Sequence, residues 1–237
     1  MTSARYWAIV PAAGSGQRFG AELTKQFQSI AGRTVADHTL NRLLSIPALT
    51  KIIVPCEIAN GGWQQVVALQ DPRVQRVAGG EQRVHSVLLG LRALSDIADD
   101  QDWVLVHDMA RPCITAGDIK KLMTQLVDHA VGGILATPVS DTLKQVTANS
   151  AIQGTLDRSH YWAAQTPQMF RYGLLLKAFE TMLAAQQVPT DEASAIEYLG
   201  EQPAVVAGRR DNIKITHRED MIIAEAIMAY QESEQCV

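Results

Sequence analysis

Short runs rich in β-branched and aromatic residues alternate with runs of helical periodicity along most of this chain. The candidate strands are Tyr6–Val10, Lys51–Cys56, Val74–Ala78, Trp103–His107, Gly133–Pro138, Ala204–Ala207 and Asn212–Thr216. Helices lie between them, and the clearest is predicted over Glu81–Leu94, where one apolar stripe recurs every three or four residues. This β-α-β-α order predicts an α/β fold built on a parallel sheet.

Continuously apolar strands such as Trp103–Val106, WVLV, are what a sheet covered on both faces requires. Right-handed crossovers then place every strand-to-helix loop along one edge of the sheet, where ligands bind in such folds. With 237 residues, 47% of them hydrophobic, the chain can bury a full core, and it contains no internal repeat or linker. We therefore expect a single domain over residues 1–237.

The composition argues against several classes of protein. A formal net charge of −4 does not favour extended binding to nucleic acid or to a membrane surface. Three widely spaced cysteines, Cys56, Cys113 and Cys236, argue against a disulfide framework or a structural zinc site. About five apolar residues precede Pro11, too few for a signal peptide, and no run reaches the ~18 apolar residues of a membrane span. A reducing cytoplasm is the simplest setting.

The alternation breaks between Ser140 and Ser159, where two short polar strands flank a small-residue turn around Ala148–Ser150. This pattern predicts a β-hairpin arm over residues 140–159. A two-stranded ribbon is marginal by itself in water, so we expect the arm to pack outside its own core, on a second subunit.

Three helices are predicted in the last third of the chain. Two cover Tyr172–Gln186 and Glu192–Leu199, and Thr190 offers a side chain that could cap the second of them. A last helix is predicted from Thr216, with Glu219 reaching back to complete a capping box.

The first strand-to-helix loop, Val10–Phe27 (VPAAGSGQRFGAELTKQF), nearly matches two known phosphate-binding loops. A P-loop places Lys and then Ser or Thr directly after its last glycine, whereas Gly20 is followed by Ala21 and Glu22. The dinucleotide fingerprint needs a third glycine where Phe19 stands. The loop therefore fits neither pattern.

The loop nevertheless keeps groups suited to a triphosphate. Gly14 and Gly16 allow successive backbone N–H groups to face an anion. Arg18 and Lys25 add two positive charges, one a planar fork of donors and the other a compact point charge. The alternative is a tight turn with two solvated cations.

Two further motifs carry charged residues toward the same edge of the predicted sheet. VLVHDMARP ends a buried strand, and Asp108 there could hold a hydrated magnesium ion beside phosphates, or could cap a turn and pair with Arg111. In GRRDNIKIT, Asp211 and Lys214 converge on one ligand only if the chain turns near Asn212; the alternative is a solvated charge cluster.

A fourth motif, GGEQRVHS, precedes a helix whose amino end can receive an anion or a base edge. Ser86 and Glu81 are candidates for polar contacts there, although Glu81 could equally stabilise the helix dipole. The histidines show no paired metal spacing, and no serine lies in a G-x-S-x-G motif. A histidine-ligated metal and covalent catalysis therefore have little support.

Together these segments resemble the 2-C-methyl-D-erythritol 4-phosphate cytidylyltransferase family. The shared motifs, in the family's order and near its spacing, are PAAGSGQR with KQF, GGEQRVHSV, VHDMARP, SDTLK, LDR, QTPQ, TDEASA and DNIKIT, from Trp7 to Glu225. The resemblance implies a Rossmann-like nucleotidyltransferase fold with a protruding β-arm. It also implies a homodimeric enzyme of the non-mevalonate isoprenoid pathway, dependent on Mg²⁺ or another divalent cation, that joins CTP to methylerythritol phosphate and releases pyrophosphate.

The resemblance assigns roles by position. Nucleotide contacts are implied for Ala12, Ala13, Gly14, Ser15, Gly16, Gly80, Glu81 and Ser86. Contacts with the sugar phosphate are implied for Arg111, Thr190 and Lys214, and a substrate contact is implied for Thr166. Arg18 and Lys25 would hold the triphosphate, and Asp108 would carry the magnesium ion, with Asp211 as its second partner. Thr142 and Arg158 would reach the acceptor bound to the neighbouring subunit, so that each site is composite.

Three positions depart from the family's usual pattern. Thr24 stands where proline commonly precedes the lysine, which would loosen the loop because proline fixes its backbone angle. Glu81 stands where aspartate is frequent, and Met109 replaces an alanine beside Asp108, with an expected effect on pocket volume.

Other functions remain as alternatives. Ribitol-5-phosphate cytidylyltransferases share the loop, the HDxxRP element and the dimeric arm, while LDR, QTPQ and DNIKIT favour the methylerythritol substrate. A non-catalytic nucleotide-binding protein is a further alternative. A dinucleotide-dependent oxidoreductase is nearly excluded by Phe19.

Overall fold

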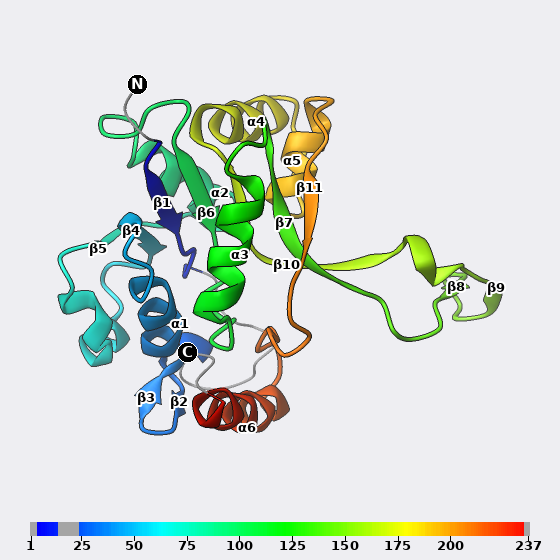
Figure 1. Cartoon of the computed structure of the whole chain (residues 1–237), viewed down its shortest axis with the longest axis horizontal. Coiled ribbons are helices and arrows are strands. Elements are labelled where there is room, and N and C mark those ends of the chain that lie inside the picture. The colour runs from blue at the N-terminus through cyan, green and yellow to red at the C-terminus, as the bar shows by residue number, and fades with distance from the viewer. Residues whose placement is uncertain (1–3, 14–23, 235–237) are drawn as a thin grey trace.

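A computed structural model describes residues 4–13 and 24–234 of the chain (Figure 1). Its centre is a seven-stranded sheet in the order β11-β7-β10-β6-β1-β4-β5. The strands are β1 Tyr6–Ile9, β4 Leu49–Cys56, β5 Val74–Ala78, β6 Trp103–Val106, β7 Gly132–Pro138, β10 Trp162–Arg171 and β11 Ala204–Ala207. Within this sheet, all strand pairs are parallel except the two that β10 makes with β6 and β7. The predicted mostly parallel α/β fold is confirmed.

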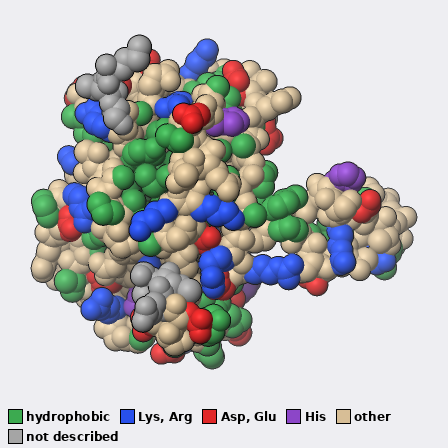
Figure 2. All heavy atoms as spheres, in the orientation of Figure 1, with side chains coloured by type: hydrophobic (Ala, Val, Ile, Leu, Met, Phe, Trp, Pro, Cys, Tyr) green, Lys and Arg blue, Asp and Glu red, His purple; other side chains and the backbone are tan. Residues whose placement is uncertain are grey.

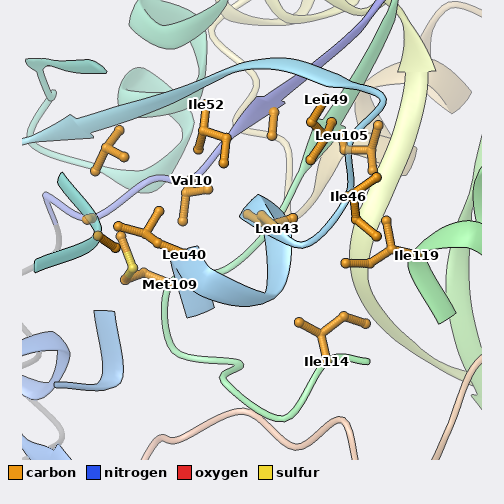
Figure 3. Packing of buried hydrophobic residues seen from close by; sticks show 14 of the residues in the cluster. Val10, Leu40, Leu43, Ile46, Leu49, Ile52, Leu105, Met109, Ile114 and Ile119 are labelled. Atoms are coloured by element: carbon orange, nitrogen blue, oxygen red, sulfur yellow. The ribbon is translucent and has the colours of Figure 1, made fainter. Parts of the chain in front are cut away.

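Helices cover both faces of this sheet, because each strand sends alternate side chains to opposite sides. In β1, Ala8 packs with α1 (Val35–Leu44) and α3 (Ala116–Leu126), whereas Trp7 and Ile9 face the other helices. Those helices are α2 Arg83–Arg92, α4 Tyr172–Ala184 and α5 Glu192–Tyr198. Figure 3 shows side chains of α1 meeting those of β4 and β6 in the first of these cores.

The helix starts follow from local capping. Thr34 and Thr115 precede α1 and α3, and each hydroxyl accepts a hydrogen bond from the backbone N–H three residues later. Such a cap stabilises a helix by about 1 kcal/mol because it satisfies one of the free N–H groups of the first turn. The long crossovers that these helices form allow neighbouring strands to run parallel.

The last helix begins later than the sequence predicted. The structure has α6 at Glu219–Ser233, and its N-cap residue Arg218 makes no side-chain capping bond. Instead Asp220 accepts hydrogen bonds from the N–H groups of Thr216 and His217, at 2.7 and 2.8 Å. The predicted capping box of Thr216 and Glu219 is therefore wrong, because Asp220 supplies the acceptor.

The predicted strand Asn212–Thr216 is also wrong. The segment is a loop, in which the Ile215 N–H donates to the Ala110 carbonyl at 2.8 Å. Ile215 is buried beneath α6, so the alternating apolar residues that suggested a strand serve this packing instead.

The predicted arm over residues 140–159 is present. It contains β8 Lys144–Val146 and β9 Ile152–Thr155, paired antiparallel, and Figure 1 shows it projecting far from the body. Ser150 lies in the turn with a φ of +64°, the left-handed conformation that many hairpin turns place at one position. Short elements complete the chain: β2 Ser29–Ile30, β3 Arg33–Thr34, η2 Lys25–Phe27, η3 Gly61–Gln65, η4 Val67–Gln70 and η5 Arg158–His160. Among the described helices, none has the length and apolar character needed to span a membrane.

Candidate active site

Asp108 lies at the centre of a cluster of charges just beyond the carboxyl end of β6. Its Oδ1 lies 3.0 Å from Arg83 Nε, and its Oδ2 lies 2.8 Å from Lys214 Nζ and 3.5 Å from Arg111 Nε. The Asp108 side chain is 9% exposed. Three cations thus converge on one buried carboxylate, from α2, from the loop after β6 and from the segment before α6.

These cations keep Asp108 ionised. Burial by itself would raise the pKa of this carboxyl, but Arg83, Lys214 and Arg111 together outweigh burial and hold the pKa well below its usual range. The cluster still carries a surplus of positive charge, since Arg83, Arg111 and Lys214 face two carboxylates, Asp108 and the Glu192 that pairs with Arg83. Such a surplus attracts an anionic ligand.

Arg111 is fixed by a second contact. Its Nη1 donates to the Asn212 carbonyl at 2.7 Å, and the Asn212 side chain donates to the Thr166 carbonyl at 2.9 Å. The Nε atom of Arg111 is buried and makes no hydrogen bond within the described part of the chain. An orphaned donor beside Asp108 is a group that a phosphate oxygen could satisfy.

His107 is linked to the backbone of Asp108 through the Thr166 hydroxyl and carries no charge in the cluster. The Thr166 hydroxyl accepts from the Asp108 N–H at 3.0 Å, so its own proton is directed to His107 Nδ1, also 3.0 Å away. His107 Nε2 then donates to the Arg111 carbonyl at 3.1 Å. Burial lowers the pKa of His107 to about 4, so this histidine is neutral at pH 7 and orients the loop.

This buried histidine predicts a pH dependence of stability. An unfolded histidine titrates near ~6.5, whereas His107 titrates at about 4 when folded. The unfolded state therefore binds more protons between these values, and stability falls as the pH falls through this window. Between pH 7.5 and pH 4.5 we expect the wild type to lose about 2–3 kcal/mol more free energy of unfolding than His107→Gln, measured by urea denaturation. Equal losses in the two proteins would refute this role.

Lys25 lies close to the segment that carries Lys214. It opens η2, and its Nζ donates to the Ile215 carbonyl at 3.2 Å. The next two residues anchor it: Gln26 donates to the Ala12 carbonyl, and buried Phe27 packs edge to face on Trp63. Thr24 has a φ of −60°, the value that proline would impose, so the absence of proline does not change the backbone angle there.

The strand-end loops after β1 and β5 approach each other closely. A Cβ placed on Gly79 would lie 2.5 Å from the Cβ of Ala13, so the close approach requires glycine. The Gly80 N–H donates to the Ser86 hydroxyl at 3.1 Å. The structure thus brings Ala12, Ala13, Gly80 and Ser86 to one end of the sheet, whereas Gly14, Ser15, Gly16 and Arg18 lie outside the described residues.

Other predicted site residues are placed differently. Glu81 and Thr190 are exposed, and the N-cap of α5 is Asp191 rather than Thr190, with Ser194 completing a capping box. The predicted Thr190 cap is therefore wrong. Met109 packs into the core shared with α1, as Figure 3 shows, so its longer side chain is accommodated by the core.

Asp211 has partners of its own. Arg209 Nη2 lies 2.5 Å from one of its oxygens, and Gln231 of α6 donates to the same oxygen at 3.2 Å. No contact among the described residues joins Asp211 to Asp108. Its role as a second metal ligand stays a prediction, and the role would require Asp211 to leave Arg209.

Thr142 and Arg158 belong to the arm, whose strands β8 and β9 project away from the body (Figure 1). Both side chains are exposed, and Arg158 donates to the Ser140 carbonyl at the base of the arm. The described contacts of one chain therefore do not bring these two residues to the site.

A single carboxylate suits a metal ion that arrives with its substrate. No group of three or more His, Cys, Asp or Glu side chains is arranged to hold a metal ion within residues 4–13 and 24–234. Magnesium in nucleotide enzymes is commonly held by one or two carboxylates together with substrate phosphates. Asp108 fits this pattern, because it is ionised, lies at the ligand edge and is surrounded by groups that attract phosphate. Figure 2 shows Lys and Arg side chains gathering across the middle of the visible face and toward the base of the arm.

The residues that sequence reasoning missed are Arg83 and Glu192. Arg83 Nη1 and Nη2 donate to the two Glu192 oxygens at 2.7 and 3.1 Å. Glu192 is fully buried, and burial raises the pKa of its carboxyl. Both residues lie inside motifs that were singled out, GGEQRVHS and TDEASA, but their pairing spans 109 positions and had no local signal.

Comparison with known proteins gives one consistent family. Residues 6–230 match the sequence profile of the 2-C-methyl-D-erythritol 4-phosphate cytidylyltransferases. Curated proteins of that name from Pseudomonas putida (strain GB-1) and Vibrio vulnificus (strain CMCP6) are 46% and 45% identical to this chain. These alignments cover 91% and 95% of this chain, and 92% and 95% of the relatives.

Solved structures agree with the sequence comparison. A crystal structure of the Francisella tularensis 2-C-methyl-D-erythritol 4-phosphate cytidylyltransferase aligns with a TM-score of 0.80 at 37% identity, over 94% of this chain and 100% of that one. A 4-diphosphocytidyl-2C-methyl-D-erythritol synthase aligns with a TM-score of 0.83 at 33% identity, over 96% of this chain and 100% of that one. The shared sequence and fold extend over the cluster around Asp108, and the chain belongs to the 2-C-methyl-D-erythritol 4-phosphate cytidylyltransferase family.

Proposed function

We propose that this chain transfers CMP from CTP to 2-C-methyl-D-erythritol 4-phosphate, giving 4-diphosphocytidyl-2-C-methyl-D-erythritol and pyrophosphate in the non-mevalonate isoprenoid pathway. The observation that carries the proposal is the family match over residues 6–230. The cations that converge at the carboxyl edge of the sheet, Arg83, Arg111 and Lys214 around Asp108, support it independently.

The chemistry needs charge stabilisation rather than a general base. A phosphate oxygen of the acceptor attacks the α-phosphorus of CTP, the bond from that phosphorus to its bridging oxygen breaks, and pyrophosphate leaves with the electron pair. The acceptor is already ionised at neutral pH, so no proton has to be removed. The barrier arises because two anions approach each other and charge builds up on the leaving group.

The cationic side chains supply that stabilisation. Lys25 is suited to the triphosphate, while Arg111 and Lys214 are suited to the acceptor phosphate, since all three are held by contacts at the same edge. Fixed charges of this kind lower the barrier because they need not reorganise when the new charge develops. Asp108 would hold a divalent cation, which when bound would neutralise phosphate charge. His107 and Thr166 keep Asp108 in position.

A pyrophosphate-release assay tests the proposal. With CTP and Mg²⁺ we expect release that depends on methylerythritol phosphate and is much slower with ribitol 5-phosphate. Faster release with ribitol 5-phosphate would assign the other acceptor. CTP binding without release under any acceptor would indicate a non-catalytic nucleotide-binding protein.

We further propose that the chain acts as a homodimer in which the arm of one subunit completes the site of the other. The isolated position of the arm supports this, since Thr142 and Arg158 have no described contact with the Asp108 cluster. Large apolar side chains of the arm and its base are exposed, which favours a covering partner. They are Val146, Ile152, Tyr161 and Trp162, each at least 44% exposed. The cytoplasmic setting also stays a proposal, and the wide cysteine spacing supports it.

Mixed dimers test the composite site. Lys25→Ala and Arg158→Ala homodimers should each keep about a tenth of the wild-type activity or less. After subunit exchange, a mixed dimer contains one intact site and one doubly altered site, so we expect mixing to restore up to about half of the activity in the heterodimer fraction. Recovery is measured as pyrophosphate release, with exchange verified by mass spectrometry of differently tagged subunits. Verified exchange without recovery would count against the crossing arm.

A further inference from the structure

Arg83 joins three elements of the site through one guanidinium group. It is the first residue of α2, and its Nη1 and Nη2 atoms are bonded to both oxygens of Glu192, the first residue of α5. Its remaining donor, Nε, lies 3.0 Å from Asp108 Oδ1. All three kinds of nitrogen in the fork are therefore in use, and the group has little freedom to rotate.

Glu192 is itself held rigidly. Its side chain is 0% exposed. The neighbouring backbone is clamped to β10, because Gln168 accepts from the Ala193 N–H at 2.9 Å and donates to Asp191 at 2.9 Å. Asp191 and Ser194 add a capping box. The Glu192 carboxylate that binds Arg83 is thus held in one position by its surroundings.

The two carboxylate oxygens of Asp108 contact different side chains. Oδ1 faces Arg83, whose position is set by Glu192, whereas Oδ2 faces Lys214 and Arg111. Lys214 is 38% exposed and lies on a loop, so it can move away more easily than Arg83. Oδ1 is therefore held by a fixed residue, whereas Oδ2 faces one fixed cation, Arg111, and one that can move away, Lys214.

We propose that Arg83 and Glu192 are positioning residues that hold Oδ1 of Asp108, so that Oδ2 can exchange Lys214 for the divalent cation that accompanies CTP. The inference rests on the proposed function. Lys214, once released from Oδ2, becomes available to the acceptor phosphate, which links arrival of the nucleotide to capture of the acceptor. Residues that orient a metal ligand commonly change metal affinity or activity by about 10–100-fold when they are replaced.

Arg83→Lys separates this role from a merely structural one. Lysine keeps the positive charge that Glu192 requires, but its three donors sit on one nitrogen and cannot reproduce the planar fork that reaches both Glu192 oxygens and Asp108 Oδ1. The variant should fold and bind CTP in EDTA like the wild type. We expect the factor by which Mg²⁺ increases CTP affinity, measured by calorimetry without acceptor, to fall by at least about tenfold.

The matched control is Arg92→Lys. Arg92 lies on the same helix, its side chain is 56% exposed, and it pairs with Glu180 at 3.0 Å. The same substitution there should leave the effect of Mg²⁺ on CTP affinity unchanged. A Mg²⁺ effect in Arg83→Lys equal to that of Arg92→Lys would overturn the proposal.

A second variant covers the case in which Arg83→Lys fails to fold. Apolar residues of similar size can replace a buried ion pair with little loss of stability, so Arg83→Met with Glu192→Leu should restore folding. The proposal predicts that this double variant still loses the Mg²⁺ effect at least about tenfold. A folded double variant with the wild-type Mg²⁺ effect would overturn it. Failure of both variants to fold would assign the pair a structural role and would equally overturn it.

Calorimetry with CTP needs no acceptor and no turnover, so it stays informative if the proposed reaction is wrong. Absence of pyrophosphate release in the wild type would refute the reaction. An unchanged Mg²⁺ effect in the variants would refute the positioning role alone.

Discussion

Lys25→Ala is expected to lower turnover by at least about tenfold, within a typical range of roughly 10²–10³ for loss of one preorganised charge. Lys25 lies where the loop after β1 meets the segment of Lys214, as its contact with the Ile215 carbonyl shows. An ammonium group there would offset the negative charge that grows on the leaving pyrophosphate. Alanine removes this charge and leaves no substitute for it.

The fold should survive this substitution. Gln26 and Phe27 anchor η2 through buried contacts that do not involve the lysine side chain. Circular dichroism and gel filtration should therefore match the wild type. Lys120→Ala, at an exposed position on α3, is the matched control and should turn over normally. A turnover number close to the wild type in Lys25→Ala would remove Lys25 from the mechanism.

Asp108→Asn is expected to have an effect of similar size, roughly 10²–10³ on turnover. The amide keeps the shape of the side chain and one acceptor oxygen, but it removes the negative charge that Arg83, Arg111 and Lys214 surround. A divalent cation would then lose the negative charge that offsets repulsion by these side chains. Raising the Mg²⁺ concentration should recover little of the activity, because an amide is a much weaker ligand than a carboxylate.

Asp128→Asn provides the control for Asp108→Asn, since Asp128 is exposed and lies just after α3. Steady-state pyrophosphate release over a range of Mg²⁺ concentrations measures both variants. Full activity of Asp108→Asn at saturating Mg²⁺ would show that the carboxylate is not required. It would also leave the surrounding cations without the role assigned to them here.

The local pattern of the sequence predicted the sheet well where strands are apolar throughout. Val74–Ala78 and Ala204–Ala207 match the structure at both ends, and the arm is where its polar strands indicated. β10 was missed because its sequence, WAAQTPQMFR, contains a proline and polar residues. Its stability comes from pairing with β6 on one side and β7 on the other, which is information that the segment itself does not contain.

In the candidate site, too, some residues were predictable from the local sequence and others were not. Asp108 was predictable because a carboxylate directly after a buried parallel strand must lie at the ligand edge. Its partners Arg83 and Lys214 come from positions 25 residues before it and 106 residues after it along the chain. Only the fold brings them together. Glu192 resembled an ordinary first-turn acid, and nothing local indicated that it is fully buried against Arg83.

The most direct test of the central claim is ³¹P NMR of one reaction containing CTP, Mg²⁺ and methylerythritol phosphate labelled with ¹⁸O in its phosphate. Direct attack of the acceptor phosphate on the α-phosphorus predicts 4-diphosphocytidyl-2-C-methyl-D-erythritol and pyrophosphate in equal amounts. All of the label should then be in the cytidyl product. Label in the pyrophosphate, or pyrophosphate formed without the cytidyl product, would contradict the account.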